Sequence, residues 1–331
     1  MRKVKLDNDK VNFTFITDIH LSTVAPGRRG DDYQRAILDK LHFVSELTHK
    51  INGACLCGGD FFHVKNARSP ANSLAMISEA IEELGAFPQG KLWGAQGNHD
   101  LLNDSILDGQ PLGVLIAAGV YHDLSVSPVV FTDEAESVQV LVEAFPYEHS
   151  GTLDRILNAS PRPKGVQYRI GIVHAYGEPG NGGSMFGEPI IGYNECKGSD
   201  YDFLLWGHDH SRKETVEVEN TTHVHLGSLS RASLDSDQVD RPVVCALLSF
   251  TSDGVRYKEK EIPVAPLEIS FVTADKPVER VEKSDEIKEF FADMDEQVGE
   301  LDVEDPRDIL KSICPPEEHE VLVLINDLCE F

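Results

Sequence analysis

The sequence predicts an α/β protein whose core is built from layers of sheet and helix. In the first 120 residues, short apolar segments of strand length alternate with longer segments of helical periodicity, which is typical of βαβ units. From about residue 126 most apolar segments are short and strand-like, so a second set of strands is expected. The length of 331 residues and the hydrophobic content of 41% allow one large domain with a small appendage.

The elements of the first half follow from periodicity and from signals at helix starts. Strands are expected at 11–17, at 51–57 and in KLWGAQ, and helices at 32–49 and in PLGVLIAAG. A further helix is expected to run to about residue 84, with Ser69 as its N-cap and Pro70 at its first position.

The second half is expected to be mostly strands, with one helix near 149–158. The strands are predicted at 127–131, 138–145, 166–173, 202–206, 213–218, 222–226 and 242–249. Segment 177–192 is rich in glycine and proline, which predicts a loop at the rim of a site. After Pro263 and Pro266 the chain becomes acidic, with candidate helices near 283–297, 305–312 and 316–329. Domains of 1–265 and 266–331 are therefore predicted.

The net charge, the cysteines and the lengths of the apolar segments limit which partners and which cellular location are expected. The net charge is −26, and residues 268–331 contribute 20 acidic and 6 basic side chains, a net of −14. Proteins that hold nucleic acid by its phosphates usually carry a basic surface, so this balance disfavours a free-standing DNA binder but permits a local basic path. The six scattered cysteines are expected to be reduced and mostly buried, as in a cytosolic protein. No secretory signal or apolar segment of about 20 residues is found, so no membrane association is expected.

Five short polar clusters each follow an expected strand. They are DIH at 18–20, GGD at 58–60, GNHD at 97–100, VHA at 173–175 and GHDH at 207–210. Asp, Asn and His suit divalent first-row metals, and ligands two residues apart point to one side of an extended segment. The glycines before Asp60, Asn98 and His208 allow close backbone approach. Two ions about 3.5–4 Å apart can clamp a phosphoester, so the clusters predict a two-metal hydrolase.

The five clusters resemble the signatures of the calcineurin-like metallophosphoesterases, over about residues 11–250. The resemblance implies a four-layer α/β/β/α sandwich, here with a small acidic, mainly helical C-terminal extension. It implies two divalent ions, Mn²⁺ first and Mg²⁺, Fe²⁺ or Zn²⁺ as alternatives, with Asp60 as the shared ligand. The implied ligands of the first ion are Asp18, His20, Asp60 and His210, and those of the second are Asp60, Asn98, His174 and His208.

The family pattern gives His99 the role of general acid toward the leaving oxygen. Asp100 would orient His99 and keep it protonated. The alternative for His99 is a further metal ligand or a spectator. Outside the clusters, His223 and His225 alternate on one expected strand without an accompanying carboxylate, so both are interpreted as structural.

The segment GGDFFHVKNARSP is similar to the SbcD-type double-strand-break repair nucleases, and so is LGSLSRAS at 226–233. This resemblance implies a DNA substrate, an SMC-like ABC ATPase partner and a cytoplasmic or nucleoid-associated protein. It would place His63 beside the substrate phosphate, although His63 could instead cap a helix or pack. Homodimerisation through the apolar faces at 37–47 and 74–84 is also compatible with it, but burial of these faces inside the fold explains them equally well.

Several cations could line a DNA path, although each could equally be an ordinary solvated side chain. They are Arg28, Arg29, Lys65, Arg68, Arg212, Lys213 and Arg231. Two other functions stay open: a small-molecule phosphodiesterase or phosphatase of the same superfamily, and a non-catalytic scaffold. The acidic C-terminal segment is compatible with a compact cap, an ATPase-docking tail or a DNA-mimicking tail.

Overall fold

The computed structural model describes residues 2–66, 68–101, 109–185, 187–232 and 241–271. The chain divides into two units, Met1–Val272 and Thr273–Phe331. The helices expected at 283–297, 305–312 and 316–329 lie outside the described residues. The proposed boundary between residues 265 and 266 therefore stays a prediction.

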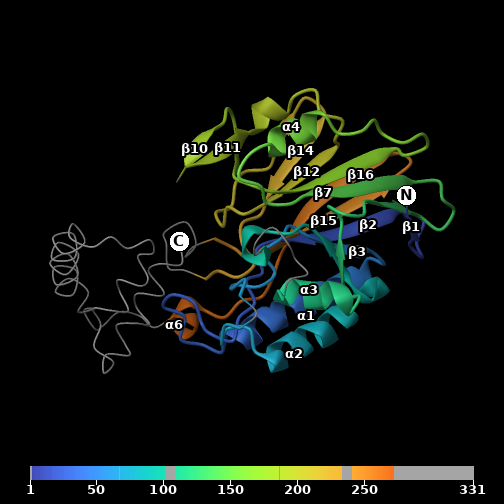
Figure 1. The fold of residues 1–331 in the computed structure, drawn as a ribbon. Helices are drawn as coiled ribbons and strands as arrows, with labels where there is room; N and C mark the ends of the chain where they lie inside the picture. Colours follow the sequence, from blue (N-terminus) through green and yellow to red (C-terminus); the bar gives the residue numbers. More distant parts are fainter. Residues whose placement is uncertain (1, 67, 102–108, 186, 233–240, 272–331) are drawn as a thin grey trace, which may run out of the picture. The chain divides into compact units, whose positions relative to one another are not determined.

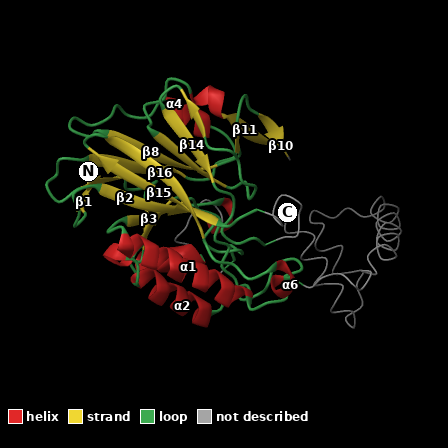
Figure 2. Cartoon of the chain, turned by 180° about the vertical axis from the view of Figure 1, so that it is seen from behind, coloured by secondary structure: helices red, strands yellow, loops and turns green. Residues whose placement is uncertain are grey.

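The first sheet has six strands in the order β16-β15-β2-β3-β4-β5. Its parallel strands are β2 (Val11–Ile16), β3 (Ala54–Cys57), β4 (Leu92–Gly94) and β5 (Tyr121–Asp123), and its antiparallel edge is β15 (Val244–Thr251) with β16 (Gly254–Glu261). The helices α1 (Tyr33–Lys50), α2 (Leu74–Gly85) and α3 (Pro111–Ala117) lie together against one face of this sheet (Figures 1 and 2).

The second sheet has seven strands in the order β1-β6-β7-β8-β12-β14-β13. They are β1 (Arg2–Lys5), β6 (Val129–Thr132), β7 (Gln139–Phe145), β8 (Tyr168–His174), β12 (Phe203–Gly207), β13 (Val216–Val218) and β14 (Thr221–His225). The short helices α4 (Thr152–Leu157) and η3 (Tyr193–Cys196) cover its outer side, next to a small sheet of β9 (Gly177–Glu178), β10 (Gly183–Met185) and β11 (Glu188–Gly192). The remaining short helices of the described chain are η1 (Pro88–Gly90), η2 (Asn98–Asp100) and α6 (Leu267–Ser270).

Three buried apolar layers lie between four layers of secondary structure. Ile37 of α1 belongs to the first, between the helices and the first sheet. Phe13 and Phe131 meet edge to face in the second, between the two sheets, with ring centroids 5.0 Å apart. Trp206 and Ile156 belong to the third, between the second sheet and α4. This arrangement confirms the predicted four-layer α/β/β/α sandwich for the described part of the chain.

One helix start was predicted wrongly. α2 begins at Leu74, and Ser73, not Ser69, is its N-cap, with the Ser73 side chain accepting a hydrogen bond from the Met76 amide at 3.2 Å. The carbonyl of Pro70 accepts a hydrogen bond from the Thr23 hydroxyl. The Pro70 carbonyl is thus bound to the loop at Thr23 and not to a helix amide, and residues 69–72 form a turn before α2.

The segment 177–192 also differs from the expectation of a loop. It forms β9, β10 and β11, because strand pairs such as Gly183 with Ile190 and Ile191 with Gly177 satisfy its backbone. The strands β1, β5 and β16 were not predicted. Their exposed or short sequences carry too few apolar residues for a periodicity signal.

Two expectations about surfaces can be compared with the structure. Cys55, Cys57, Cys196 and Cys245 are free and buried, as predicted, whereas the other two cysteines lie outside the described residues. The apolar faces at 37–47 and 74–84 pack inside the chain, so they give no support to a dimer interface. Among the described residues, no helix has the length and apolar character needed to cross a membrane.

Candidate metal centre

The polar clusters meet where the strands of both sheets end. β2 and β3 are parallel neighbours, so the residues that follow them run side by side. The amide of Asp18 donates to the carbonyl of Gly59 at 3.2 Å, and the amide of His20 donates to the carbonyl of Asp60 at 3.0 Å. In α/β proteins, ligands bind outside the carboxyl ends of strands, and the clusters occupy that place.

Four residues of the clusters have left-handed backbone conformations. The φ angles are 52° at Asp18, 49° at His20, 50° at Asp60 and 87° at His208. Residues other than glycine rarely adopt positive φ, and such strain gathers at functional sites, where the surrounding structure enforces it. These turns re-aim the side chains at the strand ends so that they converge.

Glycines allow the loops to approach each other closely. A Cβ at Gly97 would lie 2.0 Å from Oδ1 of Asp60 and 2.5 Å from the Asp60 amide nitrogen. A Cβ at Gly59, where φ is +105°, would lie 2.5 Å from Nδ1 of His174. These contacts confirm that the glycines before Asp60 and Asn98 are needed for close approach.

The ligand set implied for the first ion comes together. Asp18, His20, Asp60 and His210 each offer an atom within 4.8 Å of the others. Nε2 of His20 lies 2.8 Å from Nε2 of His210 and 3.6 Å from Oδ2 of Asp60. Atoms about 2.0–2.2 Å from a common ion are at most about 4.4 Å apart, so small adjustments would suffice to hold one.

The ligand set implied for the second ion also comes together. Asp60, His174 and His208 offer atoms within 4.8 Å of one another. Oδ1 of Asn98 lies 3.2 Å from Nε2 of His174 and 3.0 Å from Nδ1 of His208. Nδ1 of His174 is 2.7 Å from the carbonyl of Gly58, which favours a proton on Nδ1 and leaves Nε2 to act as a ligand.

The electrostatics of the cluster fit a bound cation. Asp18 and Asp60 are buried, and no Lys or Arg of the described chain pairs with either carboxylate. Burial raises the pKa of Asp18, and burial would also raise that of Asp60, but His174, His99 and His20 hold the pKa of Asp60 well below its usual range. Buried carboxylates require a paired cation or a metal. The His and Asp cluster therefore suggests divalent metal ions, whose identity the geometry leaves open.

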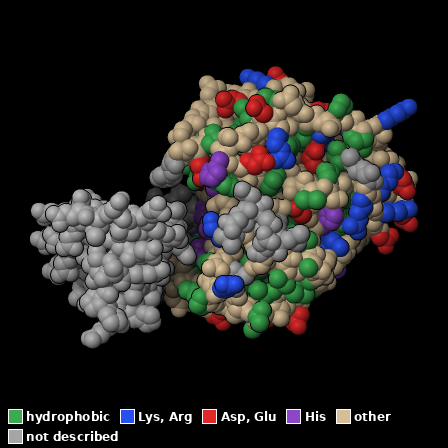
Figure 3. Space-filling model, viewed as in Figure 1, with side chains coloured by type: hydrophobic (Ala, Val, Ile, Leu, Met, Phe, Trp, Pro, Cys, Tyr) green, Lys and Arg blue, Asp and Glu red, His purple; other side chains and the backbone are tan. Residues whose placement is uncertain are grey.

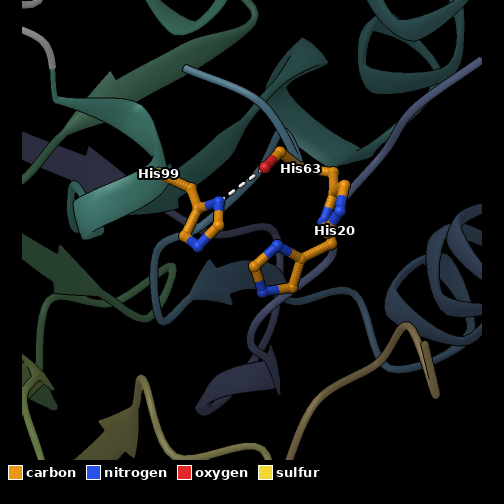
Figure 4. Close-up of side chains that lie close together, drawn as sticks. All are labelled: His20, His63 and His99. Atoms are coloured by element: carbon orange, nitrogen blue, oxygen red, sulfur yellow. Dashed lines mark hydrogen bonds between the residues drawn. The ribbon is translucent and has the colours of Figure 1, made fainter. Parts of the chain in front are cut away.

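His63, His99 and His20 form a third group at the edge of the cluster (Figure 4). The ring centroids of His20 and His99 are 4.9 Å apart, and those of His63 and His99 are 5.8 Å apart with the rings nearly parallel. Nδ1 of His99 lies 2.5 Å from the backbone oxygen of His63, so that carbonyl orients the ring. The partly buried His63 ring thus lies in the site without capping a helix.

The predicted partnership between Asp100 and the His99 ring is wrong. The Asp100 carboxylate is buried and accepts hydrogen bonds from the amides of Phe61 and Gly97. It joins the GNHD loop to the segment after β3, while the carbonyl of His63 takes the place beside the imidazole. Burial raises the pKa of Asp100 to about 7, and the charge of Asp60 adds to this effect.

Three residues next to the cluster were not predicted as site residues. Oε2 of Glu188 lies 3.3 Å from Nε2 of His208, and the Tyr147 hydroxyl donates to Oε1 of Glu188 at 2.9 Å. The ring centroid of Tyr176 is 4.2 Å from that of His208. Glu188 had a signal, because it lies in the segment 177–192 that was expected at the rim of the site, and Tyr147 ends the sequence FPY at 145–147.

The cations proposed for a DNA path divide into three groups. Arg29 and Arg231 are buried, and Arg29 pairs with Asp31 and donates to the carbonyl of Arg231, so both belong to the interior rather than to a DNA-contacting surface. Arg212 pairs with Glu259, and Lys213 pairs with Asp209. The third group of these cations is exposed and forms no ion pair with any described residue; it consists of Arg28, Lys65 and Arg68.

The two alternating histidines belong to none of the groups of described residues that could hold a metal ion, as the structural interpretation expects. His223 is buried, stacks on Tyr193 and accepts a hydrogen bond from the Trp206 indole at 3.2 Å. His225 is buried beside the Asp209 carbonyl, at 2.9 Å.

A two-sheet sandwich with a His and Asp cluster at its strand ends defines a class of metal-dependent hydrolases. Residues 11–212 match the family model of the calcineurin-like phosphoesterases, and the chain belongs to this family. The match and the cluster together support a metal-dependent phosphoesterase.

The solved structures that match this chain are distant from it in sequence. A 5'-nucleotidase precursor from Thermus thermophilus is 12% identical, with a TM-score of 0.43, and the match covers 79% of this chain and 55% of that one. This chain thus spans about half the length of the Thermus protein. Vps29 from Chaetomium thermophilum is 13% identical, with a TM-score of 0.31, over 77% of this chain and 98% of that one. Among curated proteins, none matches this chain.

Proposed function

We propose that the protein is a two-metal phosphodiesterase that cleaves DNA, a Mn²⁺-dependent nuclease of DNA repair, recombination or processing that works with an SMC-like ABC ATPase. The observation that carries the proposal is the position of His63. This residue ends the GGDFFH segment that resembles the SbcD-type nucleases, and its ring lies beside those of His99 and His20. An additional imidazole at this point could contact a phosphate of the substrate strand.

The two ligand sets of the candidate metal centre would hold the ions. The first ion would be held by Asp18, His20, Asp60 and His210, and the second by Asp60, Asn98, His174 and His208. Two divalent ions supply an activated water near neutral pH and stabilise charge on the phosphoryl oxygens.

His99 would supply the proton to the leaving oxygen. Since Nδ1 of His99 faces the His63 carbonyl at 2.5 Å, Nδ1 keeps its proton there, and the second proton that a general acid carries, on Nε2, would pass to the leaving oxygen. This orientation depends on the backbone of residue 63, so the nuclease-like segment also positions the general acid.

Two exposed cations that follow His63 in the sequence support a strand path that starts at His63. Lys65 and Arg68 follow His63 by two and five residues and are exposed. On the face drawn in Figure 3, Lys and Arg side chains are interspersed with Asp and Glu. Such a surface fits a few local phosphate contacts, which position a strand without reading its sequence.

A second candidate is a small-molecule phosphodiesterase or phosphatase. One observation favours it: a cavity of about 440 Å³ adjoins the cluster, and none of the described residues that line it is Lys or Arg. This volume lies in the range of about 300–1,000 Å³ that is usual for small-molecule sites.

The two candidates can be separated with the purified full chain, Mn²⁺ and labelled linear DNA. The nuclease proposal expects Mn²⁺-dependent cleavage, alone or with a cognate ATPase, that falls in His63→Asn. The matched control is His42→Asn, since His42 is an exposed histidine on the surface of α1, with 62% of its side chain accessible. Turnover of bis(p-nitrophenyl) phosphate or a cyclic nucleotide without any DNA cleavage would select the small-molecule enzyme. A protein without any hydrolytic activity under these conditions would point to the scaffold.

A further inference from the structure

A cavity lies between the outer helix layer and the small sheet, next to the candidate metal centre. Its volume is about 440 Å³. It is bounded by the loop that enters α4 at Ser150–Leu153, by Gly182 and Gly183 at β10, and by Glu188–Ile191 of β11. The segment predicted to be a loop thus supplies most of one wall.

The cavity and the metal centre share a wall. Tyr147, Tyr176 and Glu188 line the cavity, and each also contacts His208 of the second ligand set. The Tyr147 and Tyr176 ring centroids are 5.3 Å and 4.2 Å from that of His208, and Glu188 reaches Nε2 of His208 at 3.3 Å. A group bonded to a phosphate at the second ligand set could therefore extend directly into the cavity.

The lining excludes some ligands. Glu148, Glu188 and Glu195 are its charged residues, and the described lining contains no Lys or Arg. Glu148 pairs with Arg155, which lies outside the lining, whereas neither Glu188 nor Glu195 has a Lys or Arg partner among the described residues, so the lining still disfavours a further phosphate. The three carboxylates accept hydrogen bonds from N–H and O–H groups, and in this cavity they accompany two tyrosine rings and the apolar side chains of Leu153, Ile190 and Ile191. This lining suits a flat, uncharged group that carries N–H donors.

We propose that this cavity binds the nucleobase of the nucleotide whose phosphate lies at the metal centre. The base would lie against the rings of Tyr147 and Tyr176, since aromatic faces stack on bases with little sequence preference. Its N–H groups would donate to the carboxylates of the lining. This inference rests on the proposed function, because it assumes that the phosphoester is part of a nucleotide, in a DNA end or in a small molecule.

Gly183 offers a clean way to block the cavity. A Cβ at this position would meet no atom within 4 Å, and its φ is not positive, so a larger side chain can be added without backbone strain. Because Gly183 lines the cavity, Gly183→Leu adds a bulky apolar side chain to its lining. Gly85→Leu is the matched control, because Gly85 at the end of α2 is equally open and lies outside the cavity lining.

The first experiment measures binding of deoxyadenosine to the full chain in EDTA, by saturation-transfer NMR. Since deoxyadenosine has no phosphate and EDTA removes metals, this measurement does not depend on hydrolytic activity. We expect binding to the native protein and to Gly85→Leu, and its loss in Gly183→Leu. Absence of binding to the native protein, or unchanged binding to Gly183→Leu, overturns the proposal even if DNA is cleaved.

The second experiment compares Mn²⁺-dependent hydrolysis of three p-nitrophenyl phosphodiesters: the ester of deoxyadenosine monophosphate, a methyl ester without a base, and a choline ester. In Gly183→Leu, kcat/KM for the nucleotide ester should fall about tenfold or more relative to the methyl ester. An equal fall for both would overturn the proposal. A preference for the choline ester that Gly183→Leu abolishes would also overturn it, since the acidic cavity would then be a site for cations.

Discussion

Gly97→Ala gives the sharpest test of how the cluster is assembled. At this residue φ is −97° and ψ is 177°, which alanine adopts without strain, so the substitution changes only the space that is filled. The new Cβ would lie 2.0 Å from Oδ1 of Asp60, whereas ordinary contact begins at 3.4 Å, so this oxygen must retreat by about 1.4 Å. The same Cβ would lie 2.5 Å from the Asp60 backbone nitrogen, so it cannot avoid the carboxylate by moving toward the Asp60 backbone.

A displacement of this size exceeds what a metal site tolerates. Oδ2 of Asp60, which faces His20 at 3.6 Å and His174 at 3.5 Å, belongs to the same rigid carboxylate and must move with Oδ1. Ligand distances must stay within about 0.2 Å of their usual values, so Asp60 would leave both ligand sets. Loss of support around a metal commonly costs about 10–100-fold in affinity, and loss of the shared ligand should reach at least the upper end. Overpacking should also lower the free energy of unfolding by about 1–3 kcal/mol.

Isothermal titration of the metal-free protein with Mn²⁺ measures the first effect, and urea unfolding measures the second. Gly85→Ala is the control, because a Cβ at Gly85 meets no atom within 4 Å, and it should match the native protein in both assays. A folded Gly97→Ala protein that binds two Mn²⁺ ions with native affinity would show that Asp60 does not join the two ligand sets.

Three further predictions concern the surroundings of the cluster. His99→Gln should lower kcat for phosphodiester hydrolysis by about 10²–10⁴-fold while Mn²⁺ affinity in the titration stays native; a fall in affinity instead would make His99 a ligand. Asp100→Ala should lower the free energy of unfolding of the metal-free protein by about 2–4 kcal/mol in urea, because two buried amides lose their acceptor; unchanged stability would contradict this structural role. Burial, with Arg29 and two other arginines nearby, lowers the pKa of Lys40 to about 7, so between about pH 7 and pH 10.5 the unfolded chain holds the extra proton and the contribution of Lys40 to the free energy of unfolding rises with pH. The stability of the native protein relative to Lys40→Met should therefore rise across that window in thermal unfolding, and a difference that does not change with pH would contradict the lowered pKa of Lys40.

The sequence predicted most of the core because the core strands and helices carry strong periodic patterns. The strand β2 and the apolar face of α1 follow from the alternation in VNFTFI and from the spacing of Ile37, Leu41 and Val44. The burial of Thr14 does not follow from that alternation, because it depends on α1, whose Thr48 hydroxyl lies 2.7 Å from that of Thr14. The helix start at Leu74 was missed because two serines could each act as a cap. The structure shows that residues 69–72 form a turn that is hydrogen-bonded to Thr23, whose hydroxyl donates to the Pro70 carbonyl and whose amide donates to the Ala71 carbonyl.

By itself, the sequence determined which residue types follow the strands. Asp, Asn and His in glycine-flanked clusters indicate metal-assisted hydrolysis, because these side chains suit divalent metal ions. Tertiary structure decided which groups touch. It assigned the His99 ring to the His63 carbonyl and Asp100 to two amides, and it brought Glu188 from a glycine-rich segment to His208. The physical reason is that strand spacing fixes which side chains can share a face, whereas the backbone turns at positive φ and the pairing of distant segments fix where those side chains point.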